Sequence, residues 1–427
     1  MRRVCLVTPA HLTANGRLVR EADALAEAGY DVHVFACQWM DWATEADETI
    51  LANAKWGTTL LGWGASRHRY LFWKSRLRQR AYRHWLGLQR SGPLTEREEE
   101  VALRAYDRVI PELRGLVLDY PAELYIAHNL QALPIAVAAA RKHDARAGFD
   151  AEDFHSGMRP FGEAPSIIDA ITEYLERRYL PQCDYITAGS PGIAEAYASK
   201  YGDSIPKALP VLNVFPLSQR PPEFRPSSEG IPMTLYWFSQ TIGADRGLED
   251  IVRAMGAVDG CKLELHLRGN WQPRYREQLT RLAATCGLTA EQIIAHPPEP
   301  PDEMVRLAAQ YDVGLALEQR VSENRDICLT NKFFTYLLAG AAIVASDTRG
   351  QRSAVESVGG AGFCYEPGDT DALADGLRLW AEDRNLLDAT RRQAWDWGTR
   401  RYNWDLEKER FLQIIDRVVG AMAVQPT

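Results

Sequence analysis

Short apolar runs rich in β-forming residues alternate with helical patterns along the first half of this chain. One helical pattern is formed by Leu18, Ala22 and Leu25, and Gly29 follows where the C-terminal cap of a helix is expected. A further helix is expected over 131–142. The runs that predict strands are 4–8, 31–36, 124–128, 145–151 and 183–189. Such alternation is typical of a parallel α/β sheet.

The alternation is interrupted once, at residues 216–230, where four prolines and three serines predict a linker. It then resumes, with expected strands at 233–239, 262–269, 312–318 and 341–347 and helices that begin near Leu248 and Met304. We therefore expect an N-terminal domain over 1–215, with an insertion at about 60–92, and a C-terminal domain over 231–400. The last stretch, 401–427, contains an amphipathic helix at 405–423 and is expected to pack back toward the N-terminal domain.

Composition narrows the class of protein. The chain has 427 residues, of which 46% are hydrophobic and 25% charged, and this excludes a disordered or fibrous chain. A net charge of -8 disfavours nucleic acid as a partner. We find no apolar run long enough to span a membrane and no signal-peptide pattern. The seven cysteines form no Cys-x-x-Cys pair, so we expect a reduced, cytoplasmic protein.

The second half contains two features that favour an anionic ligand. A polar loop enters a helix at Arg246-Gly247, where free N–H groups, the helix dipole and a guanidinium suit phosphate oxygens. Further on, Thr330 or Asn331 is expected to cap a helix, which places Lys332 in its first turn. A cation is unfavourable there unless an anion binds beside it. The alternatives are a solvated arginine at a helix start and a surface lysine packed on its neighbour.

The first half carries acidic residues and histidines at expected strand ends. Asp150, Glu152, Asp153 and His155 lie within six residues of one another, and His128 ends another strand. Close carboxylates raise the pKa of one of them, which suits a general base, whereas a structural histidine is the alternative reading. Residues with the spacing of a zinc site are not found, and Asp150 with Glu152 gives only a weak oxygen site, so we expect no metal.

A basic aromatic stretch stands out at residues 67–90. It contains eight Lys or Arg and no acid, and aromatic and leucine side chains are interleaved with the basic ones. This pattern favours a surface that rests on anionic lipid. The alternative is a helical insertion that packs its aromatic side chains on the domain and solvates its arginines.

The order of these motifs resembles glycosyltransferases of the GT-B fold, in particular glycosyltransferase family 4 (glycosyl transferases group 1). The resemblance extends over about residues 1–420 and is carried by NGRLVREADALAEAGYDVHVF, LYIAHN, RGLEDIVRAM with LELHLRG, and NKFFTYLLAG with IVASDTRG. It implies an α/β protein with two Rossmann-like domains that face each other across a cleft.

The resemblance also implies ligands and roles. The donor is a nucleotide-diphospho-sugar of UDP or GDP type, bound mainly by the second domain, and the acceptor is a carbohydrate or a lipid-linked molecule, bound mainly by the first. Arg246 and Lys332 would hold the diphosphate, and no cofactor is implied. The other implied donor residues are Gly16 in the first loop, Ser239 and Gln240 in the donor loop, Gly247, Gly269, Thr330, Asn331, and His296 in a loop beside the nucleobase.

The sequence departs from the family pattern at three positions. Two glutamates of the family are replaced by Ile327 and Thr335, and Glu152 stands where the family has a histidine near the sugar. The expected catalytic residues are Glu152, Asp153, His155 and His128.

These observations predict a glycosyltransferase that moves a sugar to a hydroxyl acceptor in cell-surface polysaccharide or glycoconjugate assembly. The resemblance implies retention of configuration and no metal, whereas a carboxylate base would favour inversion. Two other functions remain as alternatives: a nucleotide-sugar epimerase of GT-B architecture and a non-catalytic nucleotide-sugar-binding protein. The expected place is the cytoplasm, with residues 67–90 resting on the inner face of the membrane.

Overall fold

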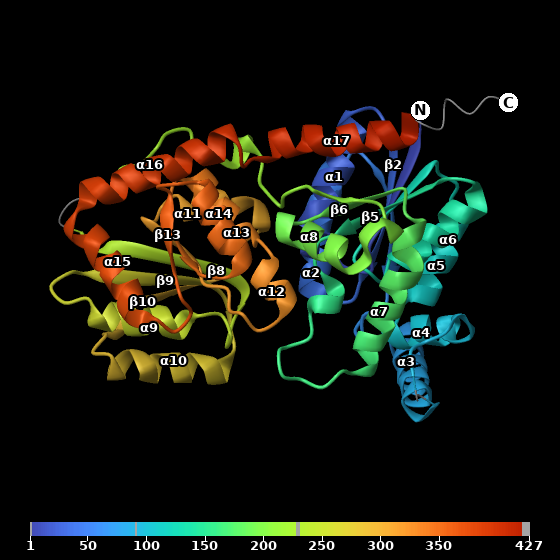
Figure 1. Ribbon diagram of the computed structural model, residues 1–427, viewed down its shortest axis with the longest axis horizontal. Coiled ribbons are helices and arrows are strands. Elements are labelled where there is room, and N and C mark those ends of the chain that lie inside the picture. Colours follow the sequence, from blue (N-terminus) through green and yellow to red (C-terminus); the bar gives the residue numbers. More distant parts are fainter. Residues whose placement is uncertain (1, 90–91, 228–230, 421–427) are drawn as a thin grey trace. The chain divides into compact units, whose positions relative to one another are not determined.

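The computed structural model describes residues 2–89, 92–227 and 231–420 (Figure 1). The chain forms two compact units: unit 1 consists of Met1–Val211 and Lys408–Thr427, and unit 2 consists of Leu212–Glu407. Each unit is built on one sheet of parallel strands. Within the described ranges, no helix has both the length and the apolar character that crossing a bilayer requires.

The sheet of unit 1 has seven strands in the order β3-β2-β1-β4-β5-β6-β7. The strands are β1 (Arg3–Val7), β2 (Asp31–Gln38), β3 (Gly57–Gly62), β4 (Leu124–His128), β5 (Arg146–Ala151), β6 (Tyr185–Ala188) and β7 (Ala208–Pro210). The first three strands extend the sheet in one direction and the last four extend it in the other. The order therefore reverses between β1 and β4.

Helices cover this sheet, and α1 (Gly16–Glu27) is the one that bears on the candidate site. Asn15 caps it, because its side-chain oxygen accepts a hydrogen bond from the Leu18 amide at 3.0 Å. Leu18, Ala22 and Leu25 are buried, as their spacing predicts. The other helices of unit 1 are α2 (Asp41–Asn53), α3 (Arg69–Gln89), α4 (Glu99–Tyr106), α5 (Ile110–Leu118), α6 (Leu133–His143), α7 (Ile167–Tyr179), α8 (Pro191–Tyr201) and most of α17 (Trp404–Gly420).

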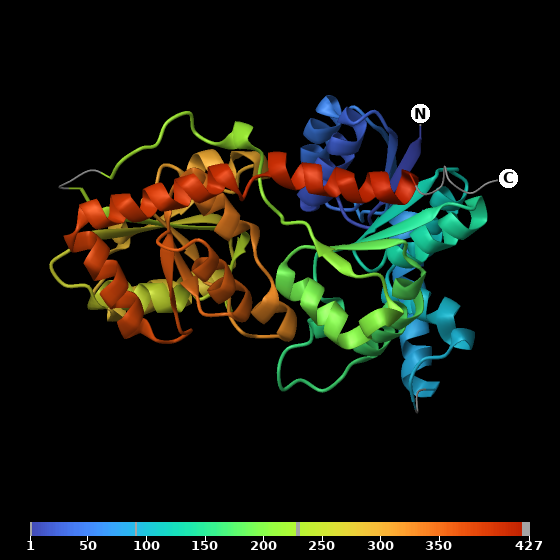
Figure 2. The same ribbon diagram turned by 45° about the horizontal axis from the view of Figure 1, so that its top comes forward.

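The part of α17 from Lys408 onward runs beside α1 (Figures 1 and 2). Tyr30 Oη donates to Asp416 Oδ1 at 2.6 Å, and Lys408 Nζ lies 3.2 Å from Glu27 Oε2. The helix expected over 405–423 is thus present to Gly420, and its last three residues lie outside the described ranges.

The sheet of unit 2 has six strands in the order β10-β9-β8-β11-β12-β13, and its order reverses between β8 and β11. The strands are β8 (Met233–Ile242), β9 (Leu263–Trp271), β10 (Ile293–His296), β11 (Val313–Ala316), β12 (Ala342–Ser346) and β13 (Gly362–Tyr365). The helices are α9 (Leu248–Ala257), α10 (Pro273–Thr285), α11 (Met304–Ala308), α12 (Glu323–Ile327), α13 (Asn331–Ala339), α14 (Arg349–Ser357), α15 (Thr370–Glu382) and α16 (Arg384–Arg400).

Alternate residues of β8 and β9 form the core of unit 2. Leu235 and Trp237 of β8 lie with Leu265 and Leu267 of β9 in one buried cluster, which also contains the apolar face of α9. Because successive strand residues point to opposite faces, their neighbours Tyr236 and His266 face the other way. The proline-rich segment also belongs to unit 2: Phe224 packs edge-on against Trp395 of α16, with ring centroids 5.8 Å apart. Residues 228–230 of that segment lie outside the described ranges.

Candidate functional site

The candidate site in unit 1 lies at the carboxyl ends of β4 and β5, beside the point where the strand order reverses. Open α/β sheets bind ligands at this place. His128 is the last residue of β4 and is paired in register with Asp150 of β5. Glu152 follows β5 directly. Three residues that the sequence singled out therefore come together at one sheet edge.

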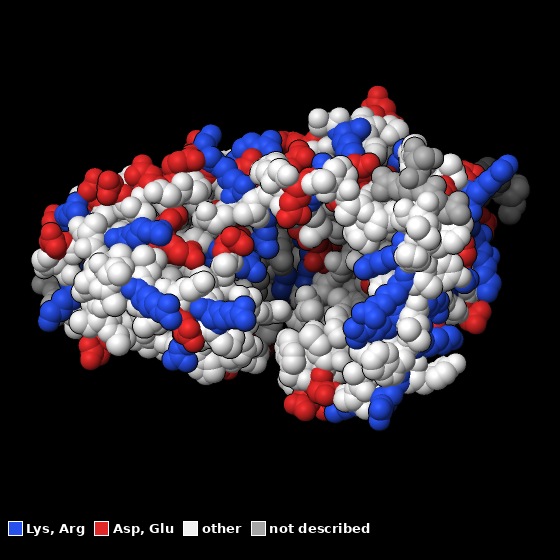
Figure 3. All heavy atoms as spheres, turned by 90° about the horizontal axis from the view of Figure 1, so that it is seen from below, with Lys and Arg blue, Asp and Glu red and all other residues white. Residues whose placement is uncertain are grey.

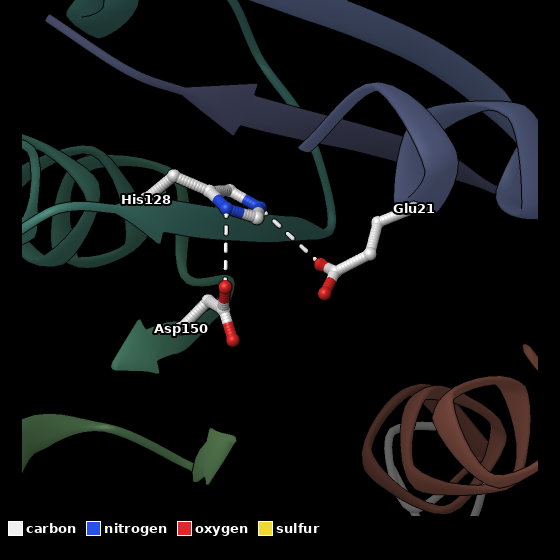
Figure 4. Close-up of side chains that lie close together, drawn as sticks. All are labelled: Glu21, His128 and Asp150. Atoms are coloured by element: carbon white, nitrogen blue, oxygen red, sulfur yellow. Dashed lines mark ion pairs between the residues drawn. The ribbon is translucent and has the colours of Figure 1, made fainter. Parts of the chain in front are cut away.

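Two charged residues of α1 complete a buried cluster with them. Arg17 donates from Nε and Nη2 to the two carboxylate oxygens of Asp150, at 2.5 and 2.6 Å. His128 Nδ1 lies 3.3 Å from Asp150 Oδ2, and His128 Nε2 lies 3.2 Å from Glu21 Oε2 (Figure 4). All four side chains are buried. Two cations thus face two carboxylates in the interior when His128 is protonated.

The four groups shift one another's pKa values. Burial lowers the pKa of His128, but Glu21 and the hydrogen bonds to Asp150 and Glu152 raise it well above the ordinary value. Burial opposes ionisation of Asp150, yet Arg17 and His128 hold the pKa of Asp150 below its usual range. Burial and the nearby Asp150 raise the pKa of Glu21. The raised pKa favours the imidazolium form of His128, which pairs with these carboxylates and is therefore not placed to act as a free base.

Glu152 is partly exposed to solvent at this edge. Its side chain is 25% exposed, and its Oε1 lies 3.5 Å from His128 Nδ1. His155, which the sequence grouped with it, lies apart: its ring is beside Phe149, with centroids 6.2 Å apart. Phe149 and Asp150 are consecutive in β5 and point to opposite faces of the sheet, so His155 packs on the side away from Asp150, and its catalytic role stays a prediction. The main-chain oxygen of Asp153 accepts a hydrogen bond from Tyr197 Oη at 3.3 Å.

The cluster also has the donor types of a metal site. One ligand-type atom from each of Glu21, His128 and Asp150 lies within 4.8 Å of the others. However, both oxygens of Asp150 are engaged by Arg17, whose guanidinium already supplies positive charge beside them. We therefore interpret this group as an ion-pair cluster that positions Glu152.

The candidate site in unit 2 lies at the carboxyl ends of β8 and β11, where that strand order reverses. After β8, residues 243–247 lead into α9, and Gly247 takes the N-cap position with a φ of 70°. A Cβ at Gly247 would lie 2.7 Å from the carbonyl oxygen of Leu317, so this loop packs on the segment that leaves β11. Arg246 is half-buried and makes no hydrogen bond or ion pair with any residue of the described ranges.

Glu318 faces Arg246 from the segment after β11 and binds Lys332. Lys332 Nζ donates to Glu318 Oε1 at 2.6 Å, and Arg325 Nη1 donates to Oε2 at 3.1 Å. Burial opposes ionisation of Glu318, but Lys332, Arg325 and Arg246 hold its pKa below the usual value. Three cations thus surround one buried carboxylate. The expected lysine is paired inside the protein and not solvated on its surface.

Helix α13 begins at this cluster. Thr330 is its N-cap residue, but the Thr330 side chain does not cap it, and its Oγ1 has no hydrogen-bond partner in the described part of the chain. Asn331 is exposed at the first helical position. The helix therefore presents main-chain N–H groups next to Lys332. Thr335 and Ile327, which replace the two glutamates of the family pattern, are buried, and the Thr335 hydroxyl bonds to the Asn331 carbonyl.

The structure corrects three local expectations about donor residues. Gly16 is the first residue of α1 and not part of a loop, because Asn15 caps the helix before it. Ser239 and Gln240 lie within β8, which continues past an irregularity to pair Thr241 with Asn270. His296 is the last residue of β10, and its Nε2 lies 2.9 Å from Nδ1 of His266.

Gly269 is required by the backbone of β9, and this gives a first prediction. Its φ is 142°, and a Cβ there would lie 2.1 Å from the carbonyl oxygen of Ser239 in β8. Gly269→Ala is therefore expected to lower the free energy of unfolding by about 1–3 kcal/mol or more. Gly115→Ala in α5 is the control: a Cβ there meets nothing within 4 Å, and replacing a helical glycine stabilises by about 0.5–1 kcal/mol. Urea denaturation followed by circular dichroism measures both, and equal stabilities would contradict the prediction.

Sequence reasoning missed Arg17, Glu21, Glu318 and Arg325. A signal existed for the first two: they stand one turn apart beside the apolar stripe of α1, so their spacing places them on the buried face. Glu318 also had a signal, because it directly follows an apolar strand at a sheet edge. The sequence contains no signal that Arg325 would turn toward Glu318.

Two units, each a parallel sheet with helices and with candidate residues at its strand-reversal edge, define the GT-B fold. No family model matches the sequence, and a search of curated proteins finds no match.

Solved structures match over nearly the whole chain. Sucrose-phosphate synthase from Thermosynechococcus elongatus is similar with a TM-score of 0.69 and 14% identity, covering 99% of this chain and 100% of that one. Anabaena HepE in complex with UDP and glucose has a TM-score of 0.70 and 14% identity, covering 98% and 100%. TarM of S. aureus has a TM-score of 0.65 and 9% identity, covering 98% and 100%. At these identities the likeness shows the fold.

Proposed function

We propose that this protein is a glycosyltransferase that moves a sugar from a nucleotide-diphospho-sugar to a hydroxyl acceptor. The observation that carries the proposal is the cation cluster at the strand-reversal edge of unit 2. There Arg246 is half-buried without a hydrogen bond or ion pair in the described ranges, Lys332 is buried beside it, and the first turn of α13 presents N–H groups. A diphosphate is the ligand whose charge and oxygen donors match these groups.

The fold supports the same proposal. HepE, whose fold the chain shares, has been solved with UDP-glucose, and WaaB, another structure of this fold, is a lipopolysaccharide outer core galactosyltransferase. We propose a donor of UDP or GDP type and a carbohydrate or lipid-linked acceptor used in polysaccharide or glycoconjugate assembly at the inner face of the membrane.

The proposed reaction balances as follows. The acceptor oxygen forms a bond to C1 of the donor sugar, the bond between C1 and the diphosphate oxygen breaks, and the nucleoside diphosphate leaves with the electron pair. Arg246, Lys332 and the start of α13 neutralise the charge that develops on it, in a reaction for which we propose no metal. In a retaining reaction, which the family resemblance favours, the leaving diphosphate can accept the hydroxyl proton.

Glu152 makes inversion the second candidate. It is partly exposed, and the imidazolium form of His128 orients it, so it is placed to accept a proton. The anomeric configuration of the product decides between retention and inversion. A base opposite the leaving group inverts the configuration at C1, whereas transfer on the front face retains it.

The test is a thermal-shift screen of the purified protein with UDP-, GDP-, dTDP- and CMP-sugars, followed by turnover assays. A ligand at one hundred times its Kd adds about 2.7 kcal/mol of stability. We expect UDP- or GDP-sugars to stabilise the protein and the sugar to be transferred only when an acceptor is present. Conversion of the donor to an epimer without acceptor would indicate an epimerase, and binding without transfer or hydrolysis would indicate a binding protein.

A further inference from the structure

Helix α3 (Arg69–Gln89) turns Arg78 and Arg83 toward its neighbours and exposes Tyr70, Trp73 and Trp85. Arg78 binds Glu112 of α5 through two hydrogen bonds of 2.7 and 2.6 Å. Arg83 Nε donates to the carbonyl of Ala105, and Gln79 donates to that of Tyr106, both at the end of α4. The alternative of an insertion that packs its aromatic side chains and solvates its arginines therefore holds only in part: Phe72 and Tyr82 pack, but Tyr70, Trp73 and Trp85 are exposed.

The outer face of α3 exposes several large apolar side chains, with basic residues interleaved among them. The apolar side chains recur at helical spacing and are exposed to the following extents: Tyr70 80%, Trp73 51%, Leu77 63%, Trp85 43% and Leu88 73%. The inner face contains Ser75 and Leu86, which are buried. Exposed apolar side chains gathered on one helix face mark an interaction site.

This face also carries positive charge. Arg69, Lys74 and Arg80 are exposed, and the segment 67–90 contains no acid. Arg69 and Arg80 form no ion pair with any residue of the described ranges, and Lys74 is half exposed at 3.8 Å from Glu112. Figure 3 views the molecule from below, the side on which α3 lies in Figure 1, and shows Lys and Arg gathered beside uncharged residues on unit 1. Arg90 of this stretch lies outside the described ranges.

We propose that the outer face of α3 docks unit 1 on the surface of an anionic lipid bilayer. Tryptophan and tyrosine occupy the interface between headgroups and acyl chains, leucines enter the acyl boundary, and lysines and arginines bind anionic headgroups. Exposed tryptophan and leucine side chains interleaved with lysine and arginine suit an anionic bilayer, because it supplies both headgroup charge and an acyl boundary. Docking here needs no donor sugar, so this inference does not depend on the proposed transfer reaction.

The test is co-sedimentation of the full chain with vesicles of phosphatidylcholine alone and of phosphatidylcholine with 30% phosphatidylglycerol. We expect binding to the anionic vesicles, weakened in 0.5 M salt. Lys74→Gln with Arg80→Gln is expected to lower partitioning about 25-fold, since each basic residue contributes about fivefold. The triple variant Trp73→Gln, Leu77→Gln, Trp85→Gln is expected to lower it tenfold or more, to about the level of the neutral vesicles. Glutamine keeps the helix propensity high.

The matched control replaces three exposed leucines of unit 2, Leu379, Leu386 and Leu406, by glutamine and should bind as the unaltered protein does. Circular dichroism and thermal unfolding check that all variants fold. The proposal is overturned if the protein does not bind anionic vesicles, if it binds neutral vesicles equally well, or if the triple variant binds as the unaltered protein does. The proposal is also overturned if the protein does not bind vesicles and sedimentation velocity shows a dimer that the triple variant lacks. That result would identify the outer face of α3 as a protein interface.

Discussion

Replacement of Arg246 by alanine is expected to lower the rate of sugar transfer by a factor on the order of 10²–10³. Arg246 stands at the N-terminal end of α9 and is half-buried without a hydrogen bond or ion pair in the described ranges, so it is available to a ligand. The charge on the leaving diphosphate grows as the bond to the sugar breaks. A guanidinium at this place therefore binds the transition state more strongly than the intact donor.

Lys332→Ala is expected to lower the rate by a similar factor, because the ammonium lies in the first turn of α13 beside the same cluster. Its effect must be separated from a loss of structure, since Lys332 is buried and paired with Glu318. Glu318→Gln provides that comparison: it breaks the same ion pair but keeps the lysine. If Lys332 acts on the diphosphate, Lys332→Ala lowers the rate far more than Glu318→Gln does.

The measurement is the initial rate of transfer with a labelled donor, together with the thermal midpoint of each variant. Arg274→Ala is the matched control, because Arg274 is an exposed basic residue in the first turn of another helix of unit 2, α10. It should transfer at the unaltered rate. Near-full turnover by Arg246→Ala and Lys332→Ala would remove both residues from the proposed donor site.

Interior strands could be predicted from the sequence, and edge strands could not. The nine expected runs all correspond to strands, from β1 to β12. The four that were not expected, β3, β7, β10 and β13, are the edges of the two sheets. An edge strand is covered by fewer neighbours and needs no continuous apolar run. The six residues of β3 are all exposed or half-buried, and β7 has only three residues.

The candidate site could be predicted in part for a related reason. Residues at strand ends, such as His128, Glu152 and Arg246, could be placed because parallel strands end at one edge of a sheet. Their partners could not, because both come from α1: Arg17 contacts Asp150 of β5 and Glu21 contacts His128 of β4, each across more than a hundred residues of chain. The register of a helix against a sheet is fixed by packing in three dimensions. Nor could the position of His155 be predicted: its ring lies beside Phe149 after the turn that follows β5.

The same buried cluster yields the largest expected change in stability. Arg17→Met leaves the carboxylates of Asp150 and Glu21 in the interior without the guanidinium that binds them. Removing one partner of a buried ion pair costs about 3–5 kcal/mol of unfolding free energy. Amide hydrogen exchange within unit 1 measures this cost in the unit that contains the cluster. Lys142→Met is the exposed control, since the Lys142–Asp119 pair has side chains 49% and 84% exposed and should contribute less than about 1 kcal/mol.

A double variant tests whether the loss comes from the uncompensated charge. Replacing Asp150 by leucine together with Arg17→Met removes both members of the ion pair, and apolar groups of similar size in place of a buried pair are often neutral. The double variant should therefore lose less stability than the Arg17→Met and Asp150→Leu single variants added together, by a coupling free energy of about 1–3 kcal/mol. A loss that is simply additive would show that the two side chains stabilise unit 1 independently, through packing. In that case the cluster would not hold Glu152 by its charges, and the interpretation of His128 as an orienting imidazolium would fail with it.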